Sequence, residues 1–160
     1  MNPIQVAFSA GLLIVLAAVT VFSAVVLRSA ARGGRAAGFG LLSGRSDFGE
    51  LGRAAFIAHR LTGFAIFAFL SLHILDVGLY SVSHDLYDDV QYLYGTAPLR
   101  VFECGLLFAI LFHTGNGLRL LAVDAFTTSA ARARQLLWAV IVVAAVGGTF
   151  GSALILAPIF

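Results

Sequence analysis

The sequence predicts an all-α membrane protein with four transmembrane helices. Of its 160 residues, 60% are hydrophobic and only 11% are charged, whereas soluble domains carry roughly 25% charged residues. Four apolar stretches alternate with polar segments, and each meets the length of about 20 residues that a helix needs to cross the hydrocarbon core of a bilayer. None of the four shows the alternating hydrophobicity of a transmembrane β-strand.

The sequence predicts three parts of the chain, which together contain the four helices. The helices run from about Ile4 to Leu27, from Phe56 to Val82, from Leu99 to Val123 and from Leu136 to Ile159. The first has no charged leader and is longer than the apolar core of about 7–15 residues in a signal peptide, so we interpret it as a retained helix. The predicted parts are an extra N-terminal transmembrane helix at residues 1–28, a Gly/Arg-rich linker at 29–55 and a three-helix domain at 56–160.

Charged residues between the apolar segments predict the orientation in the membrane. All ten basic residues are arginines, and most follow the first or the third helix: Arg28, Arg32, Arg35, Arg45, Arg53, Arg132 and Arg134. Residues 83–98 instead carry three aspartates: Asp85, Asp88 and Asp89. Because basic residues stay on the cytoplasmic side, we expect residues 28–55 and 125–135 in the cytoplasm and residues 83–98 outside. This placement explains the basic charge better than nucleic-acid binding does. The single cysteine, Cys104, excludes an internal disulfide.

The third predicted helix carries a polar stretch, HTGNGLRLLAVD, from His113 to Asp124. Ionisable groups inside a membrane helix are costly and are usually kept for function. Haem iron is commonly held by an axial histidine, which makes His113 a candidate ligand. Gly117 lies four residues later on the same helix face, where a missing side chain leaves room for a flat macrocycle. Arg119 lies about 9 Å further along the axis, toward a water interface, where a haem propionate would be within reach.

The second predicted helix carries two polar clusters. His59 and Arg60 lie at its cytoplasmic start, and Gly63 follows His59 at the same His-to-Gly spacing as on the third helix. His73 lies 14 residues after His59, about 21 Å deeper on nearly the same face. Asp76 follows one turn later and is placed to accept a proton from His73. We therefore expect one cluster near each end of this helix.

These two helices carry a resemblance to a known family. HRLTGFAIFAFLSLHILD and LFHTGNGLRLLAVD are similar to the cytochrome b membrane-anchor subunit (the C subunit) of succinate dehydrogenase, with the spacing of its actinobacterial branch. That family opens one helix with HR-x-[ST]-G and carries H-x3-G-x-R-x4-D on the next. This chain matches the second motif at His113, Gly117, Arg119 and Asp124. The resemblance covers roughly Arg53 to Ile159 and makes residues 56–160 a cytochrome b anchor domain.

The resemblance implies a respiratory assembly in a bacterial plasma membrane. The family's anchor pairs with a second hydrophobic anchor subunit. It holds an iron–sulfur subunit and a flavoprotein with FAD at the cytoplasmic face. Electrons from succinate pass through flavin and iron–sulfur clusters to menaquinone or ubiquinone, so quinone and membrane lipids are the expected small partners. The family's anchors carry one haem b or two.

The resemblance also implies haem contacts. The family's axial iron ligand falls on His113, with the opposite ligand on the partner subunit, while Gly117 and Arg119 pack against the haem and its propionates. His73 lies at a depth that suits a second haem. The residues leave plainer alternatives open: His113 as a buried histidine bonded to a neighbouring helix, and His73 as a packed side chain bonded to Asp76.

Quinone and propionate contacts of the family fall on His59 and Arg60, and Thr62 occupies the small hydroxyl position of the same motif. Some relatives carry a quinone-binding serine where this chain has Phe56. The alternative for His59 and Arg60 is an interfacial anchor that reaches lipid phosphate. The family's usual anchor has three helices, so the first helix here is an addition. A haem-free structural anchor of the same complex or of a fumarate reductase is the alternative function.

Overall fold

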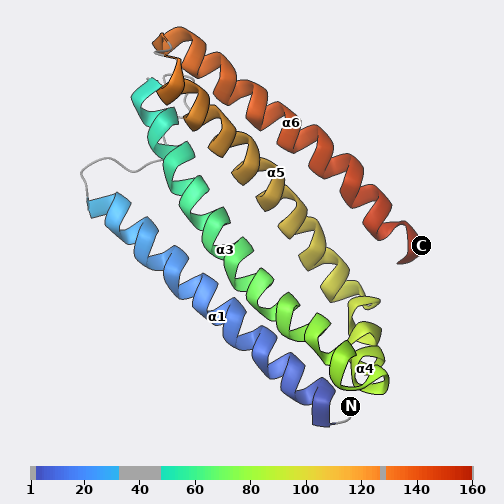
Figure 1. Cartoon of the computed structure of the whole chain (residues 1–160). Coiled ribbons are helices and arrows are strands. Elements are labelled where there is room, and N and C mark those ends of the chain that lie inside the picture. The colour runs from blue at the N-terminus through green and yellow to red at the C-terminus, as the bar shows by residue number, and fades with distance from the viewer. Residues whose placement is uncertain (1–2, 33–47, 127–128, 160) are drawn as a thin grey trace.

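The computed structural model describes residues 3–32, 48–126 and 129–159, and all regular structure in them is helical (Figure 1). The elements are α1 (Pro3–Arg32), α3 (Phe48–Val82), α4 (His84–Tyr94), α5 (Ala97–Ala125), α6 (Ala130–Leu156) and a short 3₁₀ turn η1 (Ala157–Ile159). Four of these helices are long and apolar enough to cross a membrane: α1, α3, α5 and α6. The predicted fold class is confirmed.

The four long helices lie side by side in chain order, with α1 against α3, α3 against α5, and α5 against α6 (Figure 1). Successive helices run in opposite directions, so the start of α3, the end of α5 and the start of α6 share one end of the molecule. The short helix α4 lies at the other end, against α1 and α3. The arginines that begin α3 and α6 therefore lie opposite the aspartates of α4.

The start of α3 differs from the prediction. The helix begins at Phe48, inside the segment expected to be a linker, although Gly49 and Gly52 weaken a helix. Leu51 and Ala55 are buried there in one cluster with Leu137 of α6, so tertiary packing outweighs the low helix propensity of glycine. Residues 33–47, with Arg35 and Arg45, lie outside the described residues, as does the side chain of Arg32, and for them the linker stays a prediction.

The segment expected as an outer loop contains α4. Its apolar residues recur at helical spacing, and Val90 is fully buried between its neighbours. Asp85 in the first turn is favourable because the N-terminus of a helix carries partial positive charge. His84 is exposed and stacks on Tyr80 of α3, with ring centroids 4.4 Å apart. A short amphipathic helix packed against α1 and α3 thus replaces the predicted loop.

Glycines set the close approach of α5 and α6. A Cβ atom at Gly148 would collide with the ring of Phe108, and one at Gly151 would collide with Leu107. On the other side of the contact, a Cβ at Gly115 would lie 3.1 Å from Cγ1 of Val140. Small residues at such positions let membrane helices pack tightly, which is the main source of their association in lipid.

A substitution of Leu137 tests the packing of α6 against α3. Its side chain is 0% exposed, and Phe112 and Ile141 pack against its cluster. We expect Leu137→Ala to lower the free energy of unfolding by about 2–5 kcal/mol, because the cavity refills only in part. Unfolding of the purified chain in detergent micelles measures it. The control is Leu154→Ala on the same helix, where the leucine is 62% exposed. Equal losses for the two variants would contradict the described packing.

Candidate functional site

The contact between α3 and α5 is built around two stacked imidazole rings, which we call the histidine pair. The rings of His59 and His113 are parallel to within 2°, with centroids 4.0 Å apart. Each faces a glycine of the opposite helix: a Cβ at Gly63 would lie 2.7 Å from Cε1 of His113, and one at Gly117 would lie 3.6 Å from Cε1 of His59. Because the helices are antiparallel, the two His-x3-Gly segments interlock.

Hydrogen bonds orient the ring of His113. Its Nδ1 lies 3.1 Å from the carbonyl oxygen of His59, so Nδ1 carries the proton and donates it. The hydroxyl of Thr62 donates to the carbonyl of Ala58 at 2.8 Å and lies 3.4 Å from the same Nδ1. Nε2 therefore keeps its lone pair, and it has no hydrogen-bond partner among the described residues. A fixed tautomer of this kind is the usual state of a metal-bound histidine.

The ring of His59 has an unsatisfied atom. Its Nδ1 is buried and has no hydrogen-bond partner within the described part of the chain. Buried polar atoms in proteins are normally bonded, so this nitrogen indicates a partner from outside the described chain. The stacking on His113 holds the ring in place without using either nitrogen.

Arg119 connects α5 to α6. Its Nε donates to the carbonyl oxygen of Ala133 at 3.2 Å, and its Nη1 donates to Oδ1 of Asn116 at 3.3 Å. Asn116 is only 1% exposed, and its Nδ2 has no partner among the residues that are described. The sequence interpretation missed Asn116, although an amide between two glycines in an apolar helix is itself a signal of a polar function.

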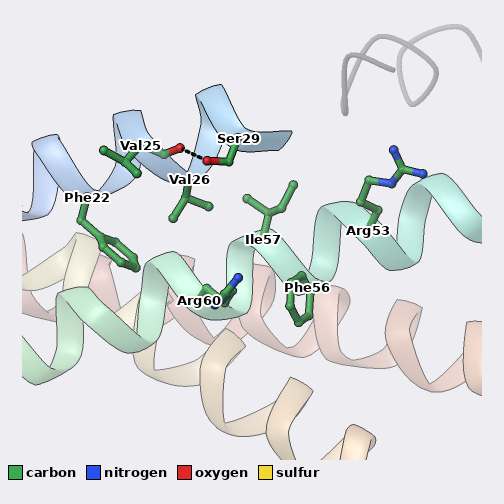
Figure 2. Close-up of a pocket in the computed structure, with 8 residues that line it drawn as sticks. All are labelled: Phe22, Val25, Val26, Ser29, Arg53, Phe56, Ile57 and Arg60. Carbon is green, nitrogen blue, oxygen red and sulfur yellow. Dashed lines mark hydrogen bonds between the residues drawn. The ribbon is translucent and has the colours of Figure 1, made fainter. Parts of the chain in front are cut away.

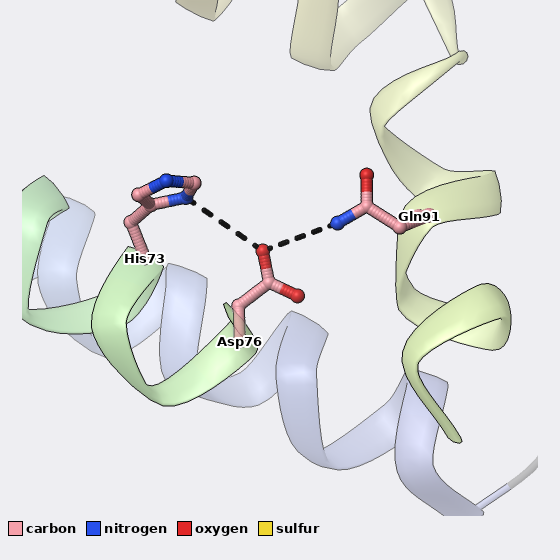
Figure 3. Close-up of polar contacts among 3 residues, drawn as sticks. All are labelled: His73, Asp76 and Gln91. Atoms are coloured by element: carbon pink, nitrogen blue, oxygen red, sulfur yellow. Dashed lines mark hydrogen bonds and ion pairs between the residues drawn. The ribbon is translucent and has the colours of Figure 1, made fainter. Parts of the chain in front are cut away.

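A second cluster lies near the C-terminal end of α3 (Figure 3). Asp76 is 2% exposed, and its Oδ2 lies 3.8 Å from Nδ1 of His73 and 3.5 Å from Nε2 of Gln91. The predicted contact of His73 with Asp76 is therefore present, and Gln91 of α4 joins it. Burial raises the pKa of Tyr94 in α4, and the nearby charge of Asp76 raises it further. The cluster is thus a buried carboxylate surrounded by proton donors.

A cavity lies between α1 and α3, and we call it the α1–α3 pocket (Figure 2). Its volume is about 610 Å³, and it is lined by Phe22, Val25, Val26, Ser29, Arg53, Phe56, Ile57 and Arg60. The guanidinium of Arg60 lies over the ring of Phe56, 5.2 Å from its centroid. Polar groups therefore meet an apolar wall near the N-terminal end of α3.

The structure brings together only some of the predicted site residues. Four of them meet at the contact of α3 with α5: His59, Thr62, His113 and Gly117. Arg60 instead lines the α1–α3 pocket, and Arg119 is bonded to α6. His73 lies beside Asp76 near α4. The three residues predicted to bind quinone therefore do not share one described pocket, because Thr62 faces α5 and Arg60 faces α1.

Comparison with known proteins places the chain in a family. Residues 41–149 match the family of the succinate dehydrogenase/fumarate reductase transmembrane subunit. The chain belongs to this family. The match includes α3, α4, α5 and most of α6, and hence both His-x3-Gly segments, whereas α1 lies outside it. The resemblance seen in the sequence is thereby confirmed.

Two relatives of this family illustrate the likeness. The succinate dehydrogenase 2 membrane subunit SdhC of Mycobacterium tuberculosis is 36% identical over 90 residues, which are 56% of this chain and 66% of that protein. The succinate dehydrogenase hydrophobic membrane anchor subunit of Halobacterium salinarum is 33% identical over 85 residues, which are 49% of this chain and 65% of that protein. Each match spans just under two thirds of the relative's own length.

Three Gly→Ala variants test the histidine pair. Alanine at Gly63 would push against a ring held by stacking and hydrogen bonds, so we expect a net loss of about 1–2 kcal/mol in unfolding free energy despite the better helix propensity. Gly117→Ala meets only an ordinary contact, and Gly78→Ala on α3 has nothing within 4 Å. Both should hold or raise the stability. The free energy of unfolding, measured in detergent micelles, compares the three variants. An equal stability of Gly63→Ala and the two controls would refute the described contact.

Proposed function

We propose that this chain is the haem-carrying membrane anchor of a succinate:quinone oxidoreductase. The observation that supports the proposal is the state of His113, whose Nδ1 is bonded to a backbone carbonyl and whose Nε2 keeps a free lone pair. Membership of the family adds the second support, because its transmembrane subunits belong to succinate dehydrogenases and fumarate reductases. The direction of electron flow follows from the partner flavoprotein and the quinone, not from this chain.

The residues present fit a haem b. His113 offers the imidazole nitrogen that iron requires, and Nδ1 of His59 is a buried polar atom that lacks a partner among the described residues. A haem would supply one-electron redox chemistry at this point of the membrane. Arg119 would pair with a propionate, since a guanidinium has five N–H donors and only two of those of Arg119 are used in the described contacts. The second hydrophobic subunit would supply the other residue that holds the iron.

A bare metal ion suits the described residues less well. Among them, no three His, Cys, Asp or Glu side chains gather to hold one. An axial haem ligand needs a single imidazole from this chain, so the histidine pair meets that requirement. In a two-haem form of the complex, His73 would be the second ligand, and Asp76 would accept the proton of its Nδ1.

The quinone site of the proposal lies at the cytoplasmic end of α3. Arg60 would donate a hydrogen bond to a quinone carbonyl from the α1–α3 pocket. His59 is the preceding residue and faces α5, and its imidazole would relay protons for the reduction of quinone to quinol. The quinone contact of Thr62 stays a prediction, because its hydroxyl is engaged beside His113.

The orientation of the complex follows from charge. Arg53 and Arg60 lie near the start of α3, and Arg132 and Arg134 lie at the start of α6. The positive-inside rule puts this end of the bundle in the bacterial cytoplasm. The iron–sulfur subunit and the flavoprotein with FAD would dock there. The segment between α1 and α3 would connect the extra helix to the three-helix anchor domain.

A haem-free anchor is the second candidate function. The bond from Nδ1 of His113 to the carbonyl of His59 also joins two helices, which is what a purely structural histidine would do. The optical spectrum of the purified complex separates the two candidates, because only the first absorbs as a reduced cytochrome b.

His113→Ala tests the haem proposal. We expect loss of the reduced-haem absorbance, because no other described side chain on α5 offers iron an imidazole, while the subunits still co-purify. A pyridine-haemochrome assay of the purified complex measures the haem content per complex. If a second haem is present, His73→Ala should remove about half of the total.

The matched control is His84→Ala, which removes an exposed imidazole on α4 and should leave the haem content unchanged. A full haem spectrum in the His113→Ala complex would defeat the assignment. In that event the haem-free anchor becomes the better account of the histidine pair.

A further inference from the structure

The α1–α3 pocket takes half of its lining from α1. Phe22, Val25, Val26 and Ser29 come from α1, and the other four side chains come from α3 (Figure 2). The helix α1 lies outside the residues 41–149 that match the family. One wall of the α1–α3 pocket is therefore formed by α1, a helix that lies outside the family match.

The helix α1 contacts the bundle at two separated points along its length. The ring of Phe22 stacks on Phe64 of α3, with centroids 4.3 Å apart and planes 23° apart. Near the other end, Nε2 of Gln5 donates to the carbonyl oxygen of Asp89 in α4 at 3.2 Å. The pocket wall thus has a defined position, which a binding site requires.

The chemistry of the lining suits a flat ring with two oxygen atoms. The rings of Phe22 and Phe56 and the aliphatic side chains of Val25 and Val26 form an apolar slot, as in most small-molecule sites. The guanidinium of Arg60 offers donors for a carbonyl oxygen. The hydroxyl of Ser29 donates to the carbonyl of Val25 at 2.8 Å, so its lone pairs remain to accept a hydrogen bond from a quinol hydroxyl.

The pocket also lies beside the candidate redox site. Ile57 and Arg60 line it, and they are close neighbours of His59 along α3. His59 faces α5, whereas the pocket faces α1. The two sites therefore lie on different faces of α3.

We propose that α1 is a working part of the quinone site and forms one wall of the pocket that holds the quinone headgroup. The headgroup lies between Val26 of α1 and Arg60 of α3, with Arg60 on a carbonyl oxygen and Ser29 on the hydroxyl of the reduced product. This inference rests on the proposed function, in which the chain binds quinone. Anionic phospholipid is the competing occupant, because its phosphate would also bind Arg53 and Arg60, the two arginines that line the pocket.

Val26→Trp in the purified complex tests the inference. The larger side chain fills the slot, so we expect the KM for a short-chain quinone to rise about tenfold or more. Succinate oxidation with a soluble dye that accepts electrons before the membrane subunits should keep its rate. The matched control is Val21→Trp, the same change at a position of α1 that is 63% exposed and outside the pocket. Val21→Trp should leave both the KM for quinone and the rate with the dye unchanged.

Arg60→Gln separates this inference from the proposed function. If Arg60→Gln raises the quinone KM and Val26→Trp does not, the quinone site stands and the role of α1 is wrong. If neither variant changes the KM, the quinone contact of Arg60 falls as well. If Val26→Trp instead removes a co-purifying anionic phospholipid without changing the KM, the pocket holds lipid and the inference is overturned.

Photoaffinity labelling of the wild-type complex covers the case in which Val26→Trp does not assemble. A quinone with an azide on its ring should label the peptide that contains residues 22–29, and an excess of unlabelled quinone should suppress the label. Labelling that avoids α1 would contradict the proposal regardless of how the variant behaves.

Discussion

The whole arrangement depends on one imidazole ring that fills the space of a missing side chain. His113 of α5 packs against Gly63 of α3, where even a methyl group would come within 2.7 Å of the ring. The same ring stacks on His59 and donates to its backbone carbonyl. Helix packing therefore sets the tautomer and direction of His113 before any ligand binds. That preorganisation is what a metal-binding imidazole needs.

The helix α3 separates two kinds of chemistry. Its α5-facing side carries the histidine pair, in which every described polar contact serves His113. Its α1-facing side carries Arg60 and the apolar slot of the α1–α3 pocket. With a haem and a quinone bound as proposed, the one-electron group and the quinone would lie on different faces of the same helix. At the far end of α3, Asp76 binds α4 to the bundle through Gln91, so the same helix also positions α4.

Hydropathy predicted the four spans because the bilayer requires long apolar helices. It misplaced the start of α3 and missed α4, since burial of Leu51 and Val90 against neighbouring helices is a tertiary effect. The spacing of His and Gly identified both segments of the histidine pair, but it assigned each glycine to the histidine of its own helix. The sequence of one helix does not determine its register against an antiparallel neighbour. The contact of each glycine with the histidine of the opposite helix was therefore not predictable. The separation of Arg60 from Thr62 was predictable, because residues two apart on one helix do not share a face.

The protonation of His113 tests the central claim most directly. Solid-state ¹⁵N NMR of the histidine-labelled, reduced complex in lipid bilayers reports which ring nitrogen carries the proton, and His113→Gln assigns the signal. The account predicts a proton on Nδ1 in a hydrogen bond and none on Nε2. A proton on Nε2, with Nδ1 bare, would contradict it, because the bond to the carbonyl of His59 and the free lone pair for iron would both be lost.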